Sequence, residues 1–282
     1  RFAPSKATRV GPRVRIGLRA RFCFAAMIGA VVSVAAVAAA GHAPPTGEPF
    51  STEPAVLVPL EDLSAVSIIG IRGQILISTR EKRELQVISR ALGAEGAELP
   101  VGIWVDGSRL IVAPVPGDRA GPRVLDVEVP KGLAIAVDAV DSEVGIASEG
   151  GAVDLRGDNV RVSVQAIGGS VTADLLAGTL TVRNSRDATV RVRATATTIE
   201  AMSGSVTVRA TGGAVTIETV DGATDVESED STLSFERLSG PLHVNAQKGD
   251  AKISGIKGGA ELALDGTPLQ LKDGKGNIVV RL

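Results

Sequence analysis

A nine-residue repeat in the C-terminal half limits the possible folds of this chain more than any other feature. From Val215 onward, an apolar–x–apolar core recurs every nine residues without slippage. The second apolar position is filled by Ile217, Val226, Phe235, Val244, Ile253, Leu262, Leu271 and Val280. The residue between the two apolar positions is nearly always polar, and such alternation indicates a β-strand with one buried face and one solvated face. The repeat therefore predicts a series of short strands.

The segments between these strands have the composition of sharp turns, as in Asp221-Gly222 and Lys257-Gly258. Glycine supplies the positive φ angles that such corners need. Three residues past each core, apolar and polar side chains alternate in the order Val220, Glu229, Leu238, Gln247, Ile256 and Asp265. Successive corners are therefore unlike, and the full repeat is a pair of nine-residue units with two strands and two corners, which is an 18-residue period.

Two architectures fit this unit. In a β-solenoid or β-roll, each 18-residue coil stacks on the one before and forms parallel sheets around a narrow core. In an antiparallel meander, the same strands pair through hairpins. The meander would leave one open, twisted sheet of about a dozen strands with an uncovered apolar face, which is unusual. We therefore predict an all-β, single-stranded solenoid over residues 141–282.

The folded region before it, residues 55–140, has longer and less regular apolar runs. Residues 101–112 contain two apolar runs around Asp106-Gly107, which predicts a hairpin. Residues 81–92 fit either a strand or a helix, because Leu85, Ile88 and Leu92 also lie on one helical face. We expect residues 55–140 to form an irregular β cap over the first coil. The last strand, residues 278–282, leaves an edge that could pair end to end with another chain.

Residues 1–40 have the pattern of an export signal. Residues 1–21 carry seven cations and no acid, and a 19-residue apolar run follows from Phe22 to Ala40. A basic segment, an apolar segment and small residues at its end are typical of a secretory signal peptide, and the run is also long enough for a signal anchor. Residues 41–54 are rich in proline and polar residues and read as a linker. We expect an exported protein, either periplasmic, cell-surface or secreted, that touches a membrane only through residues 22–40 if they are not removed.

Composition and charge exclude several classes of function. Beyond residue 24 the chain has no cysteine, and its aromatic residues there are Phe50, Trp104 and Phe235. This excludes disulfide scaffolds and cysteine nucleophiles, and it argues against binding to single-stranded nucleic acid. Seven of the 30 cations lie in residues 1–40, which leaves 23 against 32 acidic residues and a formal charge of −9. We expect an envelope or extracellular protein or polysaccharide as the partner, and no nucleic acid.

Several motifs resemble a known family. They are Val129-Pro-Lys-Gly-Leu133, then Ile135-Ala-Val137, Asp141-Ser-Glu-Val-Gly-Ile146 and the earlier run Ile69–Ile77. A strand ending in V-P-K-G, followed by repeated strands with glycine corners, resembles the exported bacterial β-strand-repeat proteins named putative adhesins, whose domain is of unknown function. The resemblance covers residues 56–282. It implies a β-solenoid or β-roll at the cell envelope and supplies no catalytic residues.

Carboxylates are the one abundant reactive group. Asp225 and Glu227 alternate on one strand, and Glu229 and Asp230 follow in the next corner. Residues two apart on a strand lie about 7 Å apart, within the range used by paired glycosidase acids. One alternative is therefore a carbohydrate-active β-helix enzyme, either a lyase or a hydrolase. The same four carboxylates could instead hold Ca²⁺ weakly and stabilise a β-roll. We favour the interpretation that these carboxylates form a solvated acidic face, with no catalytic residue and no cofactor.

The favoured function is therefore a non-enzymatic, adhesin-like or envelope-scaffold module that binds through its surface. Stacked coils would present polar rows at about 4.8 Å spacing, so that many weak contacts add by avidity. The candidate rows are Thr216, Ser234, Lys252 and Gln270 on one sheet, and Asp225, His243 and Glu261 on the other. Trp104 points to the opposite face of its hairpin from Ile103 and Val105, where it covers the core of the cap or contacts a partner.

Overall fold

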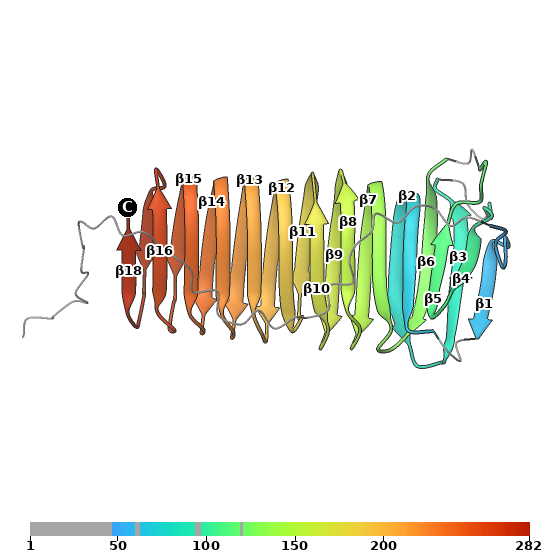
Figure 1. The fold of residues 1–282 in the computed structure, drawn as a ribbon, viewed down its shortest axis with the longest axis horizontal. Helices are drawn as coiled ribbons and strands as arrows, with labels where there is room; N and C mark the ends of the chain where they lie inside the picture. The colour runs from blue at the N-terminus through green and yellow to red at the C-terminus, as the bar shows by residue number, and fades with distance from the viewer. Residues whose placement is uncertain (1–46, 60–62, 94–96, 119–120) are drawn as a thin grey trace, which may run out of the picture.

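The computed structural model describes residues 47–59, 63–93, 97–118 and 121–282 and shows a rod of stacked β-strands (Figure 1). In this part of the chain every helix or strand element is a strand, and no helix is long and apolar enough to cross a membrane. The strands at the N-terminal end of the rod are β1 (Ala55–Pro59), β2 (Ala65–Arg80), β3 (Glu84–Ala91), β4 (Gly102–Asp106), β5 (Arg109–Ala113) and β6 (Arg123–Pro130). The predicted export segment, residues 1–40, lies outside the described residues.

The coils continue through β7 (Ala134–Glu149), β8 (Val153–Asp158), β9 (Val160–Ile167), β10 (Ser170–Leu175), β11 (Gly178–Arg183), β12 (Asp187–Met202), β13 (Val206–Val220), β14 (Thr224–Leu238), β15 (Leu242–Ser254), β16 (Ala260–Asp265), β17 (Leu269–Lys272) and β18 (Ile278–Arg281). Neighbouring coils pair in parallel. Asp225 of β14 lies opposite Thr207 of β13 and His243 of β15, one coil before it and one coil after it. The predicted solenoid with 18-residue coils is confirmed, and the meander is wrong, because hairpins would pair these strands antiparallel.

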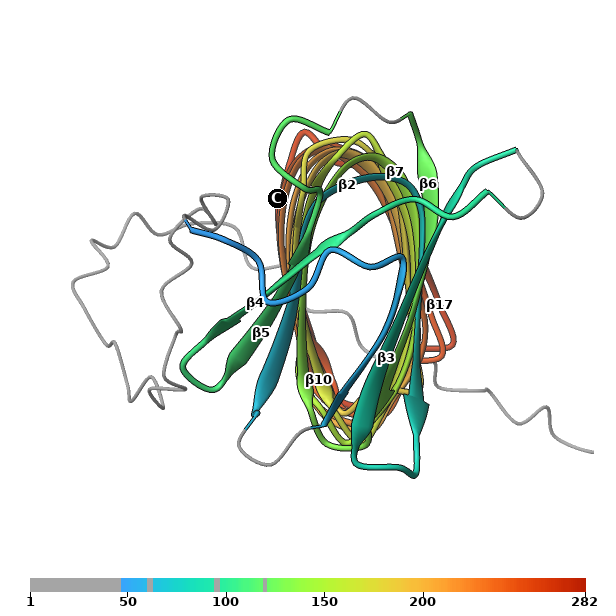
Figure 2. The same cartoon turned by 90° about the vertical axis from the view of Figure 1, so that its right-hand side faces the viewer.

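Two walls of strands face each other in the end-on view of Figure 2, and buried apolar side chains form a narrow column between them. The inward positions Val226, Phe235 and Ile253 are 0–1% exposed. The unlike corners are confirmed as well. Val220, Leu238 and Ile256 are buried at one corner, whereas Glu229, Gln247 and Asp265 are exposed at the other. Every second corner needs an apolar side chain, and the repeating unit is therefore 18 residues long.

At the exposed corner the strand bends sharply and keeps its backbone pairing with the neighbouring strands. Asp141, Asn159 and Asp230 adopt left-handed φ angles of 51°, 53° and 51°. The next residue often closes the bend: the Ser231 hydroxyl donates to the Glu229 carbonyl over 2.9 Å, and Ser142 Oγ donates to the Val140 carbonyl over 2.8 Å. Asn159 Nδ2 also donates to Asp141 Oδ1 of the preceding coil over 2.8 Å, which links the corners of adjacent coils.

The first coils are assembled out of chain order. β2 pairs in parallel with β5 and β6 on one side and with β7 on the other. In space, β5 and β6 therefore make the first coil, β2 the second and β7 the third. β7 runs without a break through residues 140 and 141, where we expected the boundary between the cap and the solenoid. The coils therefore begin earlier in the chain than the repeat indicated.

The remaining strands close the N-terminal end of the rod. β3 pairs antiparallel with β6, and β1 pairs antiparallel with β3. β4 and β5 form the hairpin predicted around Asp106-Gly107. The helical alternative for residues 81–92 is wrong: Leu85, Val87 and Ser89 are buried with a period of two, as the ladder to β6 requires.

Candidate binding face

The two polar rows predicted from the repeat lie in direct register on the outer walls. Thr216 pairs with Ser234, Ser234 with Lys252, and Lys252 with Gln270. On the opposite wall, Asp225 pairs with His243 and His243 with Glu261. Because each pair joins neighbouring parallel strands, successive side chains lie about 4.8 Å apart along the rod. The nine-residue period was therefore sufficient to predict these rows, although it did not show which strands pair.

The row of Thr216 extends further toward the N-terminus than the sequence analysis recognised. Ser163, Thr181 and Thr198 continue it on β9, β11 and β12. A ladder of hydroxyl groups thus crosses successive coils from Ser163 to Ser234 before the row changes to Lys252. Beside it runs a charged row in which Arg183 pairs with Glu200 over 2.9 Å. This wall offers many small hydrogen-bonding groups at regular spacing.

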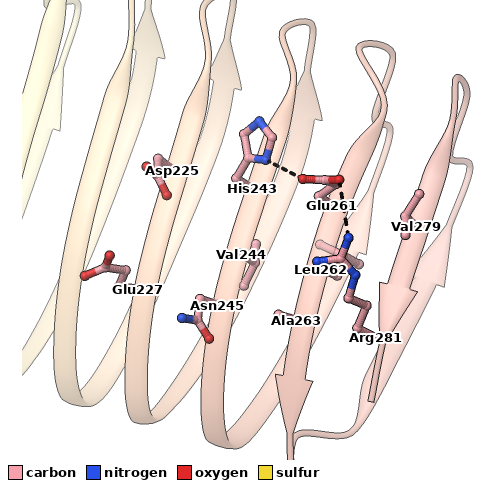
Figure 3. A pocket seen from close by; sticks show the side chains of 10 residues that line it. All are labelled: Asp225, Glu227, His243, Val244, Asn245, Glu261, Leu262, Ala263, Val279 and Arg281. Atoms are coloured by element: carbon pink, nitrogen blue, oxygen red, sulfur yellow. Dashed lines mark ion pairs between the residues drawn. The ribbon is translucent and has the colours of Figure 1, made fainter. Parts of the chain in front are cut away.

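A hollow of about 160 Å³ lies around His243 on the other wall (Figure 3). Its lining includes Asp225, Glu227, His243 and Glu261. His243 Nδ1 lies 3.5 Å from Glu261 Oε2, and Arg281 Nη2 lies 4.0 Å from Glu261 Oε1. The His243 and Glu261 side chains are 53% and 57% exposed, so a partner can reach both.

The four candidate metal-binding carboxylates do not form a cage. Asp225, Glu227 and Glu229 point outward in succession along β14, and Asp230 occupies the corner beside Lys248, with 3.8 Å between Oδ2 and Nζ. Among the described residues, no three His, Cys, Asp or Glu side chains converge to hold a metal ion. The strand spreads these carboxylates into an acidic stripe instead.

Trp104 lies away from both walls. Its side chain packs with Ile69, Ile111 and Ala113 in a small second core, and the residue is 6% exposed. Its Nε1 donates to the Gly47 carbonyl over 3.2 Å. Of the two alternatives for Trp104, the structure therefore shows the core position.

A group of arginines that was not predicted from the sequence lies next to the acidic stripe. Arg191 and Arg193 point outward on β12, and Arg209 lies beside Arg191 on β13. They line a shallow hollow of about 520 Å³ together with Thr211 and Gln247, among others. The available signal was Arg191-Val-Arg193, whose alternation with buried Val190 and Val192 puts both cations on one outer face.

Comparison with known proteins gives only distant matches. No family model and no curated protein matches the chain. The chain is similar to the crystal structure of a putative adhesin from Bacteroides fragilis, with 12% identity, a TM-score of 0.29, and coverage of 83% of this chain and 99% of that one. It is also similar to a putative cell adhesion protein from Clostridium sporogenes, with 11% identity, a TM-score of 0.28, and coverage of 66% of this chain and 99% of that one. The function has to be inferred from this chain's own residues.

Proposed function

We propose that the protein is an exported, non-enzymatic module that binds a repetitive polymer or partner at the cell envelope, in the manner of an adhesin. The observation that supports this is the register of the outer walls. Polar side chains repeat from coil to coil in straight rows, such as Thr198, Thr216 and Ser234. The same chemical group therefore recurs at a fixed interval along the rod.

Such rows suit a partner that also repeats. A single hydroxyl or charged group on a strand contributes little free energy, but contacts joined in one rigid array add, because after the first contact the others form within one complex. A parallel solenoid holds its rows straight, since each strand is hydrogen-bonded on both sides. Affinity should then depend on the number of coils.

Coil number can be changed without disturbing the register. Deleting residues 224–241 removes one 18-residue coil together with Ser234 of the hydroxyl row. It joins Ala223 to Leu242, so that Val208 pairs with Val244 just as it paired with Val226. Duplicating the same residues adds one coil. Binding of both variants and the wild type to insoluble cellulose, chitin and peptidoglycan would be measured by co-sedimentation. We expect affinity for at least one polymer to rise with coil number. The proposal would be contradicted if affinity for a retained polymer did not change with coil number, or if none of the three polymers retained the protein.

One observation favours polysaccharide cleavage as a second candidate: Asp225 and Glu227 line the same hollow. The two carboxylates would then act as an acid–base pair on a bound glycosidic bond. Release of soluble fragments from a polysaccharide, lost on Asp225→Asn and Glu227→Gln, would support the enzyme. Retention of the polymer without fragments supports the binding module.

A further inference from the structure

Three arginines on two adjacent coils line one hollow on the wall that carries the acidic stripe. Arg191 and Arg193 are two residues apart on β12 and point to the same side, which separates their Cα atoms by about 7 Å. Arg209 on β13 is the direct cross-strand neighbour of Arg191, at about 4.8 Å. All three side chains are exposed.

The charge of this group is only partly compensated. Arg209 Nε lies 2.9 Å from Glu227 Oε2. Three other arginines of the coils pair with carboxylates: Arg183 with Glu200, Arg186 with Asp187, and Arg237 with Glu218. Within the described part of the chain, no carboxylate oxygen lies within 4.0 Å of Arg191 or Arg193.

This arrangement works against folding. Like charges directly opposite each other on neighbouring strands destabilise a sheet, and Arg191 and Arg209 are such a pair. These charges lower the stability of the free protein, and they face an open hollow. An external anion can therefore bind to them. Planar guanidinium groups bind sulfate, phosphate and carboxylate oxygens in pairs of hydrogen bonds.

Three carboxylates, those of Asp174, Glu227 and Glu229, share the hollow with the three cations, and neutral hydrogen-bonding side chains complete its lining. Thr211, Asn245 and Gln247 line the same hollow. Thr189 and Thr207 are neighbours in the adjoining row, two residues before Arg191 and Arg209. Hydroxyl and amide groups donate and accept hydrogen bonds, as the hydroxyls of a sugar require.

From these groups we propose that Arg191, Arg193 and Arg209 form a subsite for an acidic polysaccharide that carries sulfate or carboxylate groups. This rests on the proposed function and names the polymer class for this wall. A single-stranded nucleic acid fits less well, because its bases need aromatic platforms. Within residues 121–282 the sole aromatic residue is Phe235, and it is 1% exposed in the core.

The neighbouring acids set the direction of the polymer. Asp174 on β10 is the cross-strand neighbour of Arg191 on one side, and the stripe of Asp225, Glu227 and Glu229 follows Arg209 on the other. Both flanks repel a polyanion, so its charged groups stay over β12 and β13 and the polymer runs along these strands. Two anionic groups about 7 Å apart then contact Arg191 and Arg193. At this subsite, short oligosaccharides should therefore bind nearly as tightly as long chains, whereas the dependence on coil number belongs to the hydroxyl row of the opposite wall.

The test compares charge-matched variants. Arg191→Gln combined with Arg193→Gln removes the two unpaired cations, and Arg183→Gln combined with Arg237→Gln removes two cations that pair with acids. Binding to heparin, to polygalacturonate and to neutral dextran would be measured by biolayer interferometry at about 0.15 M salt. We expect the first variant to bind the better acidic polymer at least about tenfold more weakly and the second to stay within about twofold of wild type. Circular dichroism verifies the fold of both.

Equal losses in the two variants, or no loss in either, would overturn the subsite. Vesicles of phosphatidylglycerol and a single-stranded DNA oligomer are further arms, and equal affinity for either would show a general anion site and overturn the assignment to polysaccharide. If the wild type binds cellulose or chitin in proportion to coil number but neither acidic polymer, the subsite is wrong and the proposed function stands. If it binds none of the polymers, both are wrong.

Discussion

Asp187 is the first residue of β12, and it links two coils at the corner that carries the buried apolar side chains. Its Oδ1 accepts from the backbone N–H of Ser205 over 2.8 Å and from the Ser205 hydroxyl over 3.0 Å, one coil further on. Its Oδ2 accepts from Arg186 Nε over 3.0 Å. Burial by itself raises the pKa of Asp187, but the hydrogen bonds from Ser205 and the guanidinium of Arg186 outweigh it and lower the pKa below the usual range.

This lowered pKa predicts a pH-dependent contribution to stability. The folded protein holds the proton of Asp187 more weakly than the unfolded chain, whose pKa is about 3.9. The stabilisation is therefore complete above that value and is lost as the pH falls through the folded-state pKa. The Asp187 side chain is 40% exposed, so water screens its contacts, and Asp187→Ala should lower the free energy of unfolding by only about 0.5 kcal/mol at pH 7 and by less at pH 3. Urea unfolding at both pH values measures this. Asp225→Ala, at an exposed carboxylate, is the control, and a penalty for Asp187→Ala that is the same at both pH values would contradict the prediction.

At the scale of the element, a column of glycines lets the coils approach one another at the corner with the buried side chain. Gly204, Gly222, Gly240 and Gly258 occupy equivalent positions, one in each successive coil. A Cβ on Gly222 would lie 2.3 Å from the Gly204 carbonyl oxygen, and one on Gly240 would lie 2.1 Å from that of Gly222. These are contacts with backbone, which a rotamer change cannot relieve.

Gly222→Ala should therefore force two coils apart and destabilise the protein by about 1–3 kcal/mol. Equilibrium unfolding in urea measures the change. Gly121→Ala is the matched control, because a Cβ there meets no atom within 4 Å, and its effect should stay within about 0.5 kcal/mol. If the two alanine variants proved equally stable, close backbone approach would not explain the glycine column.

The repeat predicted those strands whose apolar and polar residues alternate locally. It did not predict strands whose position depends on pairing with segments far away in the sequence. Val226 and Phe235 could be placed in the core, and Val220 and Glu229 at unlike corners, because each position recurs in every coil. The place of β2 could not be predicted: its apolar alternation fits any neighbour, and its partners β5, β6 and β7 come later in the chain, beyond β3 and β4. The arginines were missed for a different reason, since they lie before Val215, where the nine-residue repeat begins to run without slippage.

At the scale of the whole molecule, the rod is a one-dimensional stack in which coils pair with their neighbours along the axis. Unfolding free energy is then close to a sum over coils and the contacts between them. Deleting residues 242–259 removes one complete coil and should leave a cooperatively folded protein. Its urea m-value should fall roughly by the share of one coil, because m follows the surface exposed on unfolding.

A shorter deletion should do more damage. Removing residues 242–250 keeps the nine-residue strand repeat but exchanges the two kinds of corner in all that follows. Asp265 would then take the buried position of Ile256, and Ile256 would take the exposed position of Gln247. An unpaired carboxylate in the apolar column costs several kcal/mol, so the nine-residue deletion should be less stable than the 18-residue deletion, although it removes half as much chain. Far-UV circular dichroism and urea unfolding of the two variants decide this. Equal stability would mean that the structural unit is the nine-residue strand and corner; lower stability of the shorter deletion would establish the 18-residue coil as the unit that folding recognises.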